Sequence, residues 1–140
     1  MCRCTNAMVV SPDYGGLKRA KVFADELDLD LASVEKRRNL KTGEVKTAKL
    51  EGNVKDKIVL IFDDAILSGS TTVEVSKFLK DKGAKEVHFF ATHGVFTGTA
   101  LKDLNQSTVD SVVVTNSIAH LKLPPKITVL DISSILVENI

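Results

Sequence analysis

Two neighbouring carboxylates and a run of small hydroxylated residues are the side chains in this sequence best suited to chemistry. Asp63 and Asp64 follow the apolar run 58–62, and the segment Ser68-Gly69-Ser70-Thr71-Thr72 comes soon after them. Free N–H groups at a helix start, with Ser and Thr hydroxyls beside them, form a seat for a phosphate. Paired carboxylates beside such a seat can hold Mg²⁺ or accept hydrogen bonds from sugar hydroxyls. The alternative is a polar turn that only caps an ordinary helix.

A second turn, Asp13-Tyr14-Gly15-Gly16, separates a short strand from a helix over 17–27. Three basic residues lie near the start of this helix, where they oppose the helix dipole: Lys18, Arg19 and Lys21. An anion held at the turn would account for them. The alternative is a solvated basic face.

The remaining pattern predicts the elements that position these two turns. The run 58–62 is typical of a strand buried on both faces of a parallel sheet, and apolar residues at helical spacing follow from Val73 to a stop at Gly83. Further strands are predicted at 8–11, 29–37, 86–92, 109–115 and 126–131, and further helices from Thr99 and over 132–140. This alternation indicates an α/β fold with a mostly parallel sheet flanked by helices.

Five polar residues fall at the ends of predicted strands. Because parallel sheets bind ligands at the carboxyl ends of their strands, these residues could converge on one crevice: Asp13, Asp63, Asp64, His93 and Asn116. A histidine after a strand is also a common structural hydrogen-bonding residue, so His93 alone carries little weight.

A basic arm stands between the first two strands and the acidic pair. The run Lys36-Arg37-Arg38 is followed by a turn at 41–44 and a return segment, 45–52. This pattern predicts a β-hairpin or flap that carries positive charge. The alternative is a solvent-exposed basic run without a functional role.

Composition limits the function classes. With 140 residues, 44% hydrophobic and 26% charged, we expect one domain over 1–140, with residues 1–7 disordered or non-native. A net charge of +1 gives no electrostatic case for nucleic acid, and no apolar run suits a membrane span or a signal peptide. Cys2 and Cys4 are interpreted as free thiols rather than metal ligands. We therefore expect a cytoplasmic protein with neither nucleic-acid nor membrane partners.

The stretch from Lys57 to Thr72 resembles the phosphoribosyl-pyrophosphate (PRPP) motif of the type I phosphoribosyltransferase fold. With it, the segments SPDYGGLKRA, EKRR, ATHGVFTG and VVTNSI resemble, in order, the C-terminal half of ribose-phosphate pyrophosphokinases, or PRPP synthetases. The likeness covers nearly the whole chain from Met8. It implies a transferase of nucleotide biosynthesis that moves diphosphate from Mg-ATP to the anomeric hydroxyl of ribose 5-phosphate and releases AMP. It also implies a homodimer or higher oligomer, and a separate N-terminal half that supplies most adenine contacts.

The resemblance also implies a role for each matching residue. Lys36 and Arg38 would be the catalytic cations of a flexible loop, and His93 would support the site. The 5-phosphate would bind at Ser68, Gly69, Ser70, Thr71 and Thr72, and Asp63 and Asp64 would contact the ribose hydroxyls directly or through Mg²⁺. The pyrophosphate and ATP phosphates would bind at Asp13, Tyr14, Gly15, Gly16 and Arg19, with Asp13 joining Asp63 and Asp64 as a metal ligand.

Two departures keep other functions open. Leu67 stands where several purine phosphoribosyltransferases have an acid that serves as general base, which counts against a small PRPP-dependent phosphoribosyltransferase. Ser70 replaces a commoner glycine. The chain also has about half the length of the family's two-domain enzymes, so we expect it to need an N-terminal half for activity. A non-catalytic regulator of a complete synthetase is the remaining alternative.

Overall fold

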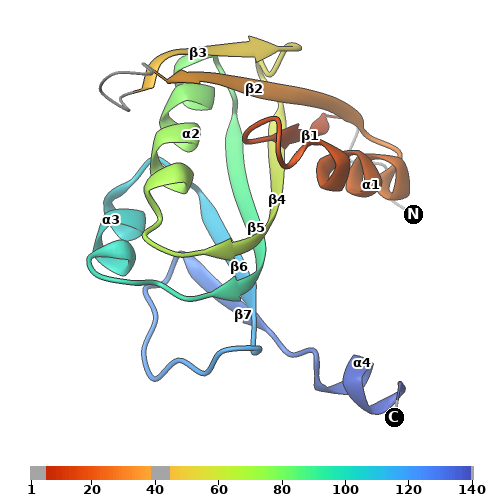
Figure 1. Ribbon diagram of the computed structural model, residues 1–140, viewed down its shortest axis with the longest axis vertical. Coiled ribbons are helices and arrows are strands. Elements are labelled where there is room, and N and C mark those ends of the chain that lie inside the picture. The colour runs from red at the N-terminus through yellow and green to blue at the C-terminus, as the bar shows by residue number, and fades with distance from the viewer. Residues whose placement is uncertain (1–5, 39–44, 140) are drawn as a thin grey trace.

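The computed structural model describes residues 6–38 and 45–139, with side chains throughout except at 36–38 and 45–48. In this part of the chain, one sheet of seven strands has the order β3-β2-β1-β4-β5-β6-β7 (Figure 1). The strands are β1 (Ala7–Ser11), β2 (Asp30–Arg38), β3 (Val45–Glu51), β4 (Ile58–Ile66), β5 (Glu86–Gly94), β6 (Ser111–Thr115) and β7 (Ile127–Leu130). All neighbouring strands are parallel except the β2–β3 pair. The predicted mostly parallel α/β sheet is confirmed.

Helices cover both faces of this sheet, as Figure 1 shows. The helix α1 (Leu17–Leu27) packs on β1, β2 and β4, whereas α2 (Ser70–Asp81) and α3 (Ala100–Gln106) lie together on the other face. The short helix α4 (Ser133–Val137) lies away from the sheet. Among the described residues, none of the helices has both the length and the apolar character that crossing a membrane requires.

Alternation along β1 supplies the two cores. Met8 and Val10 belong to the cluster beneath α2 and α3, whereas Val9 packs against Ala20 and Ala24 of α1. Successive strand residues point to opposite faces, so one strand anchors both helical layers. On the α1 face the core continues as an aromatic stack, whose rings belong to Phe23, Phe62 and Phe90.

The sheet reverses its direction of growth between β1 and β4. From β1 the chain adds β2 and then β3 on one side, and it returns to place β4 on the other side. At such a switch point the connections leave the two strands in opposite directions, which opens a crevice outside their carboxyl ends. The segments after β1 and at the end of β4 are the two that the sequence singles out.

Several boundaries differ from the predictions. Asn6 and Ala7 are ordered, because the Asn6 carbonyl accepts the Ile58 N–H at 2.8 Å and Ala7 pairs with Ile58, so the expectation of disorder through residue 7 is wrong for these two. Residues 1–5, including both cysteines, lie outside the described residues. The strand β4 runs on to Ile66, since Ala65 and Ile66 pair with β5, and the acid pair therefore lies within the strand rather than after it.

Asp110→Asn is expected to lower the free energy of unfolding by about 1 kcal/mol at neutral pH, a low value because solvent screens this partly exposed pair. Asp110 Oδ2 accepts the Val87 N–H at 2.7 Å and lies 2.7 Å from Lys80 Nζ. Burial by itself raises the pKa of Asp110, but the Lys80 and Val87 partners outweigh it and hold the pKa below its ordinary value.

The sign of the pH dependence follows from that lowered pKa. Asp110 stabilises the fold above the ordinary carboxyl pKa of 3.8, and this contribution is lost as pH falls through the lower pKa of the folded state. Urea unfolding should therefore show the difference between parent and Asp110→Asn shrinking in acid. If the difference in unfolding free energy between parent and Asp110→Asn stays constant as pH falls below 3.8, Asp110 does not stabilise the fold through its charge.

Candidate functional site

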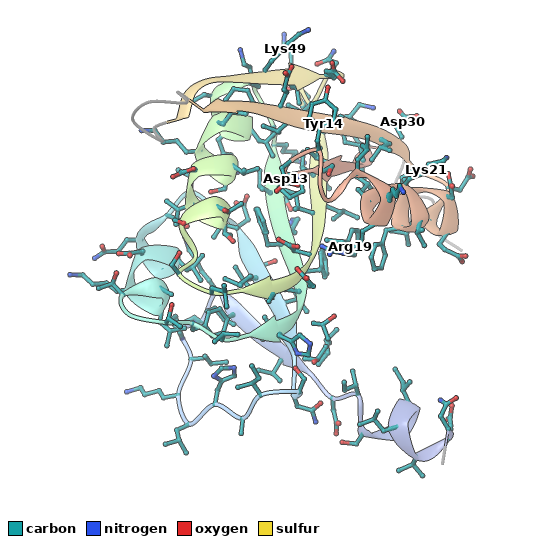
Figure 2. All side chains as sticks on the ribbon, viewed as in Figure 1. Asp13, Tyr14, Arg19, Lys21, Asp30 and Lys49 are labelled. Carbon is teal, nitrogen blue, oxygen red and sulfur yellow. The ribbon has the colours of Figure 1, made fainter. Side chains whose placement is uncertain are left out.

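The acid pair at the end of β4 is held by an arginine from α1. Arg19 Nη1 lies 2.5 Å from Asp63 Oδ1, and Arg19 Nη2 lies 3.5 Å from Asp64 Oδ2. Figure 2 shows Arg19 on the side of α1 that faces the sheet. One guanidinium thus spans two carboxylates and ties α1 to β4 across the switch point. This contact explains the presence of Arg19 near the start of α1 without a bound anion.

The two carboxylates have different environments. Asp63 is the more buried, and its Oδ1 also accepts the Asp64 N–H at 2.9 Å, whereas the Asp64 side chain is 72% exposed. Burial raises the pKa of Asp63. The hydrogen bond with the Asp63 carboxyl is the main cause that lowers the pKa of Asp64. Asp64 is therefore the member that keeps its charge further into acid and offers it to solvent.

A glycine and two serines shape the start of α2. Gly69 precedes the helix with φ of 73°, a left-handed conformation that favours glycine, and a Cβ at this position would meet Leu104 Cγ at 3.2 Å. The Ser70 N–H donates to Ser68 Oγ at 3.4 Å, whereas the N–H groups of Thr71 and Thr72 have no side-chain acceptor among the described residues. Ser68 Oγ and Ser70 Oγ lie 3.0 Å apart at the mouth of the turn. The Ser68 hydroxyl thus caps one N–H of α2, and a phosphate seat at the remaining N–H groups stays a prediction.

The turn after β1 is arranged differently. Asp13 Oδ1 accepts the Gly16 N–H at 2.8 Å, and Ser11 Oγ donates to the Asp13 carbonyl at 2.7 Å. A Cβ at Gly16 would lie 3.2 Å from Ser11 Oγ, so the turn is tightly closed. Tyr14 and the Asp13 side chain are exposed above it (Figure 2). The Asp13 carboxylate thus already satisfies one N–H that an anion at this turn would otherwise receive.

The predicted metal set is only partly brought together. Asp63 and Asp64 share Arg19, but within the described residues no three His, Cys, Asp or Glu side chains form a group that could hold a metal ion. Asp13 is not grouped with the pair in this structure, and its role as a third ligand stays a prediction. Two carboxylates still fit Mg²⁺, because that ion is commonly held by one or two carboxylates together with waters and substrate phosphates.

His93 and Asn116 each form a hydrogen bond with the segment after a neighbouring strand. Ser117 Oγ donates to the Thr92 carbonyl at 2.9 Å, so the 2.9 Å contact with His93 Nδ1 is one in which the imidazole N–H donates. Asn116 Nδ2 donates to Asp131 Oδ1 at 2.7 Å and fixes the segment after β7. The described side-chain contacts of Asn116 are with that segment, and its convergence with the other strand-end residues stays a prediction.

The basic arm is a hairpin, as predicted. The strands β2 and β3 are antiparallel, with Lys36 opposite Ala48 and Arg38 opposite Val45. The side chains of Lys36 and Arg38 lie outside the described residues, so their catalytic role stays a prediction. Leu67 is exposed between the acid pair and the phosphate seat.

Residues 39–140 match the family described as phosphoribosyl synthetase-associated domain. The chain belongs to this family. It is 44% identical over 136 residues to ribose-phosphate pyrophosphokinase 2 of Schizosaccharomyces pombe, in an alignment that covers 95% of the chain and 42% of that relative. The corresponding enzyme of Helicobacter pylori is 39% identical, with 96% and 42% covered. The chain therefore spans less than half the length of these relatives.

Solved structures agree with the fold. A crystal structure of phosphoribosylpyrophosphate synthetase from Mycobacterium smegmatis superposes with a TM-score of 0.84 and 34% identity, covering 96% of this chain and 43% of that one. A crystal structure of APRTase from Giardia lamblia superposes with a TM-score of 0.62 at 13% identity, covering 78% of this chain and 67% of that one. At that identity the second likeness concerns the fold alone, and it supports the phosphoribosyltransferase-like architecture.

Proposed function

We propose that the chain is the C-terminal, ribose 5-phosphate-binding half of a PRPP synthetase. The observation that carries the proposal is the switch-point arrangement. In it, an acid pair on β4 leads into the start of α2, where the Thr71 and Thr72 N–H groups have no side-chain acceptor among the described residues. The family and the similarity to ribose-phosphate pyrophosphokinases support it. The reaction is transfer of a diphosphoryl group from ATP to the anomeric hydroxyl of ribose 5-phosphate, with release of AMP.

Each part of the site has a task in this reaction. The open N–H groups of α2, with the hydroxyls of Ser68, Ser70 and Thr71, bind and orient the 5-phosphate. Asp63 and Asp64 hold the ribose hydroxyls or Mg²⁺, which when bound neutralises phosphate charge. The turn Asp13–Gly16 and Arg19 face the diphosphate that is transferred. Phosphoryl-type transfer depends mainly on such positioning and charge neutralisation.

The hairpin supplies the remaining charge in this proposal. Lys36 and Arg38 donate hydrogen bonds to the transferred phosphates and exclude water from them. The adenine contacts come from an N-terminal half on a separate polypeptide or on a longer chain, and the functional assembly is a homodimer or higher oligomer in the cytoplasm. Exposed apolar residues on β7 and α4 support association, because they form a surface that other subunits or domains could cover: Leu130, Ile135, Leu136 and Val137.

The experiment follows AMP and PRPP by phosphorus NMR after ATP, ribose 5-phosphate and Mg²⁺ are added. The purified chain is assayed alone and mixed with the unmatched part of the S. pombe relative as a separate polypeptide. Lys36→Ala is expected to lower turnover by about 1000-fold or more, since one cation at a phosphoryl transition state has effects of this size. Lys49→Ala is the matched control, because it removes an exposed lysine from the opposite strand of the same hairpin (Figure 2).

Product formation by the mixture, lost with Lys36→Ala and kept with Lys49→Ala, is the predicted result. If the mixture forms neither AMP nor PRPP while it binds both substrates, the catalytic proposal fails and the regulatory alternative takes its place.

A further inference from the structure

We infer that Arg19 is an internal counter-ion of the acid pair, which a divalent cation must displace and which a bound phosphate draws away. Cation and phosphate binding would then be coupled through one side chain. The inference rests on the proposed function of the site and concerns how its two ligands influence each other. It starts from the ion pairs between one guanidinium and the two carboxylates.

The positions of the charges require displacement. Arg19 Nη1 and Nη2 contact one oxygen of each carboxylate, and Asp63 Oδ1 also accepts the Asp64 N–H. Each carboxylate keeps a second oxygen outside these contacts, but a divalent cation held between Asp63 and Asp64 would lie within a few ångströms of the guanidinium. The guanidinium cannot lose its proton to relieve the repulsion. Cation and guanidinium therefore compete for the pair.

The pair is also weak enough to open. The Arg19 side chain is 38% exposed, and the side chains of its partners Asp63 and Asp64 are 29% and 72% exposed. Solvent-exposed ion pairs contribute little to stability, because water replaces the lost contacts. The bridge can therefore break without disturbing α1, whose buried residues Ala20 and Ala24 keep it on the sheet.

A phosphate offers the displaced side chain a second partner. Arg19 lies in the first turn of α1, directly after the turn that follows β1. The start of α2 comes after the end of β4, the strand to which Arg19 is already bound. A guanidinium fork matches phosphate oxygens as well as it matches carboxylates. A phosphate at this edge therefore draws Arg19 from the acid pair and frees the pair for the cation.

A purely structural ion pair predicts the opposite result. If Arg19 only fastened α1 to β4, removing it would leave the acid pair less ordered, and cation affinity would stay the same or fall. Competition predicts that removing Arg19 raises cation affinity. The sign of one binding measurement thus separates the two roles.

The experiment measures Mn²⁺ binding to the 140-residue chain by electron paramagnetic resonance, with and without ribose 5-phosphate. Arg19→Gln is expected to bind Mn²⁺ alone about 5- to 10-fold more tightly than the parent, and to lose most of the further gain that ribose 5-phosphate gives the parent. Arg19→Lys keeps a single charge and should stay close to the parent. Lys21→Gln removes a charge from the same helix, where its partner is Asp25, and should change neither value.

Each outcome decides the inference. Unchanged or weaker Mn²⁺ binding by a folded Arg19→Gln, or no Mn²⁺ binding by any variant, overturns it. If ribose 5-phosphate binds to the parent but the Mn²⁺ affinity of Arg19→Gln equals that of the parent, the coupling is refuted and the proposed function still stands. Tighter Mn²⁺ binding by Arg19→Gln with no ribose 5-phosphate binding to any variant supports the competition and refutes the proposed function.

Discussion

Ser70→Asp is expected to weaken ribose 5-phosphate binding by about 100-fold or more while the chain stays folded. Ser70 is the first residue of α2, and its hydroxyl lies 3.0 Å from that of Ser68 at the mouth of the proposed phosphate seat. A carboxylate at this position repels a phosphate within a few ångströms, an interaction of about 4 kcal/mol at the effective dielectric constant near a protein surface. The same carboxylate favours the helix start through the dipole, so stability is expected to be unchanged or slightly higher.

Two further variants control this experiment. Ser70→Ala removes only the hydroxyl and should weaken binding several-fold. Lys77→Gln changes the net charge by the same amount as Ser70→Asp but lies further along α2 on an exposed position, and it should have little effect. Calorimetric titration with ribose 5-phosphate measures all three. Equal affinity of Ser70→Asp and the parent would place the phosphate elsewhere.

Asp64→Asn is expected to remove most of the Mg²⁺ dependence of ribose 5-phosphate binding. The Asp64 carboxylate is exposed and keeps its charge further into acid than an ordinary aspartate, so it is the oxygen donor that a cation meets first. Its contact with Arg19 is the longer of the two, and the fold should therefore survive the change. We expect an affinity loss of about 10-fold in Mg²⁺ and little loss without it.

The comparison variant for this prediction is Asp25→Asn. It removes a carboxylate that pairs with Lys21 on α1, outside the acid pair, and the Mg²⁺ dependence should remain. If Asp64→Asn binds ribose 5-phosphate as well as the parent in Mg²⁺, the central role of the acid pair is wrong.

Local patterns predicted most of the elements. The helix over 17–27 has the predicted bounds, and Gly83 follows α2 with φ of 91°, which explains why the helix stops there. The hairpin was predictable from a turn between two strand-like segments. The length of β4 was not, because Ala65 and Ile66 extend the strand only through their pairing with β5.

Contacts between segments that are distant in the sequence limited how much of the site could be predicted. The sequence placed Asp63 and Asp64 beside a helix start, but Arg19 is 44 residues away from Asp63 and was expected to face phosphate. Asn116 shares the strand-end position of the other site residues, yet Asp131 from the next strand end engages it. Such partners depend on strand order, which short-range periodicity does not encode. The strand-to-helix pattern that predicts a phosphate seat is contained within one continuous segment.

The most direct test of the account is a calorimetric titration of the chain with ribose 5-phosphate, in Mg²⁺ and without it. Ribose and inorganic phosphate are titrated in parallel. We expect ribose 5-phosphate to bind more tightly than ribose or inorganic phosphate, and more tightly still with Mg²⁺, because the phosphate seat and the acid pair hold two ends of one ligand. Equal binding of ribose 5-phosphate and inorganic phosphate, indifferent to Mg²⁺, would contradict the claim that these two features form one site.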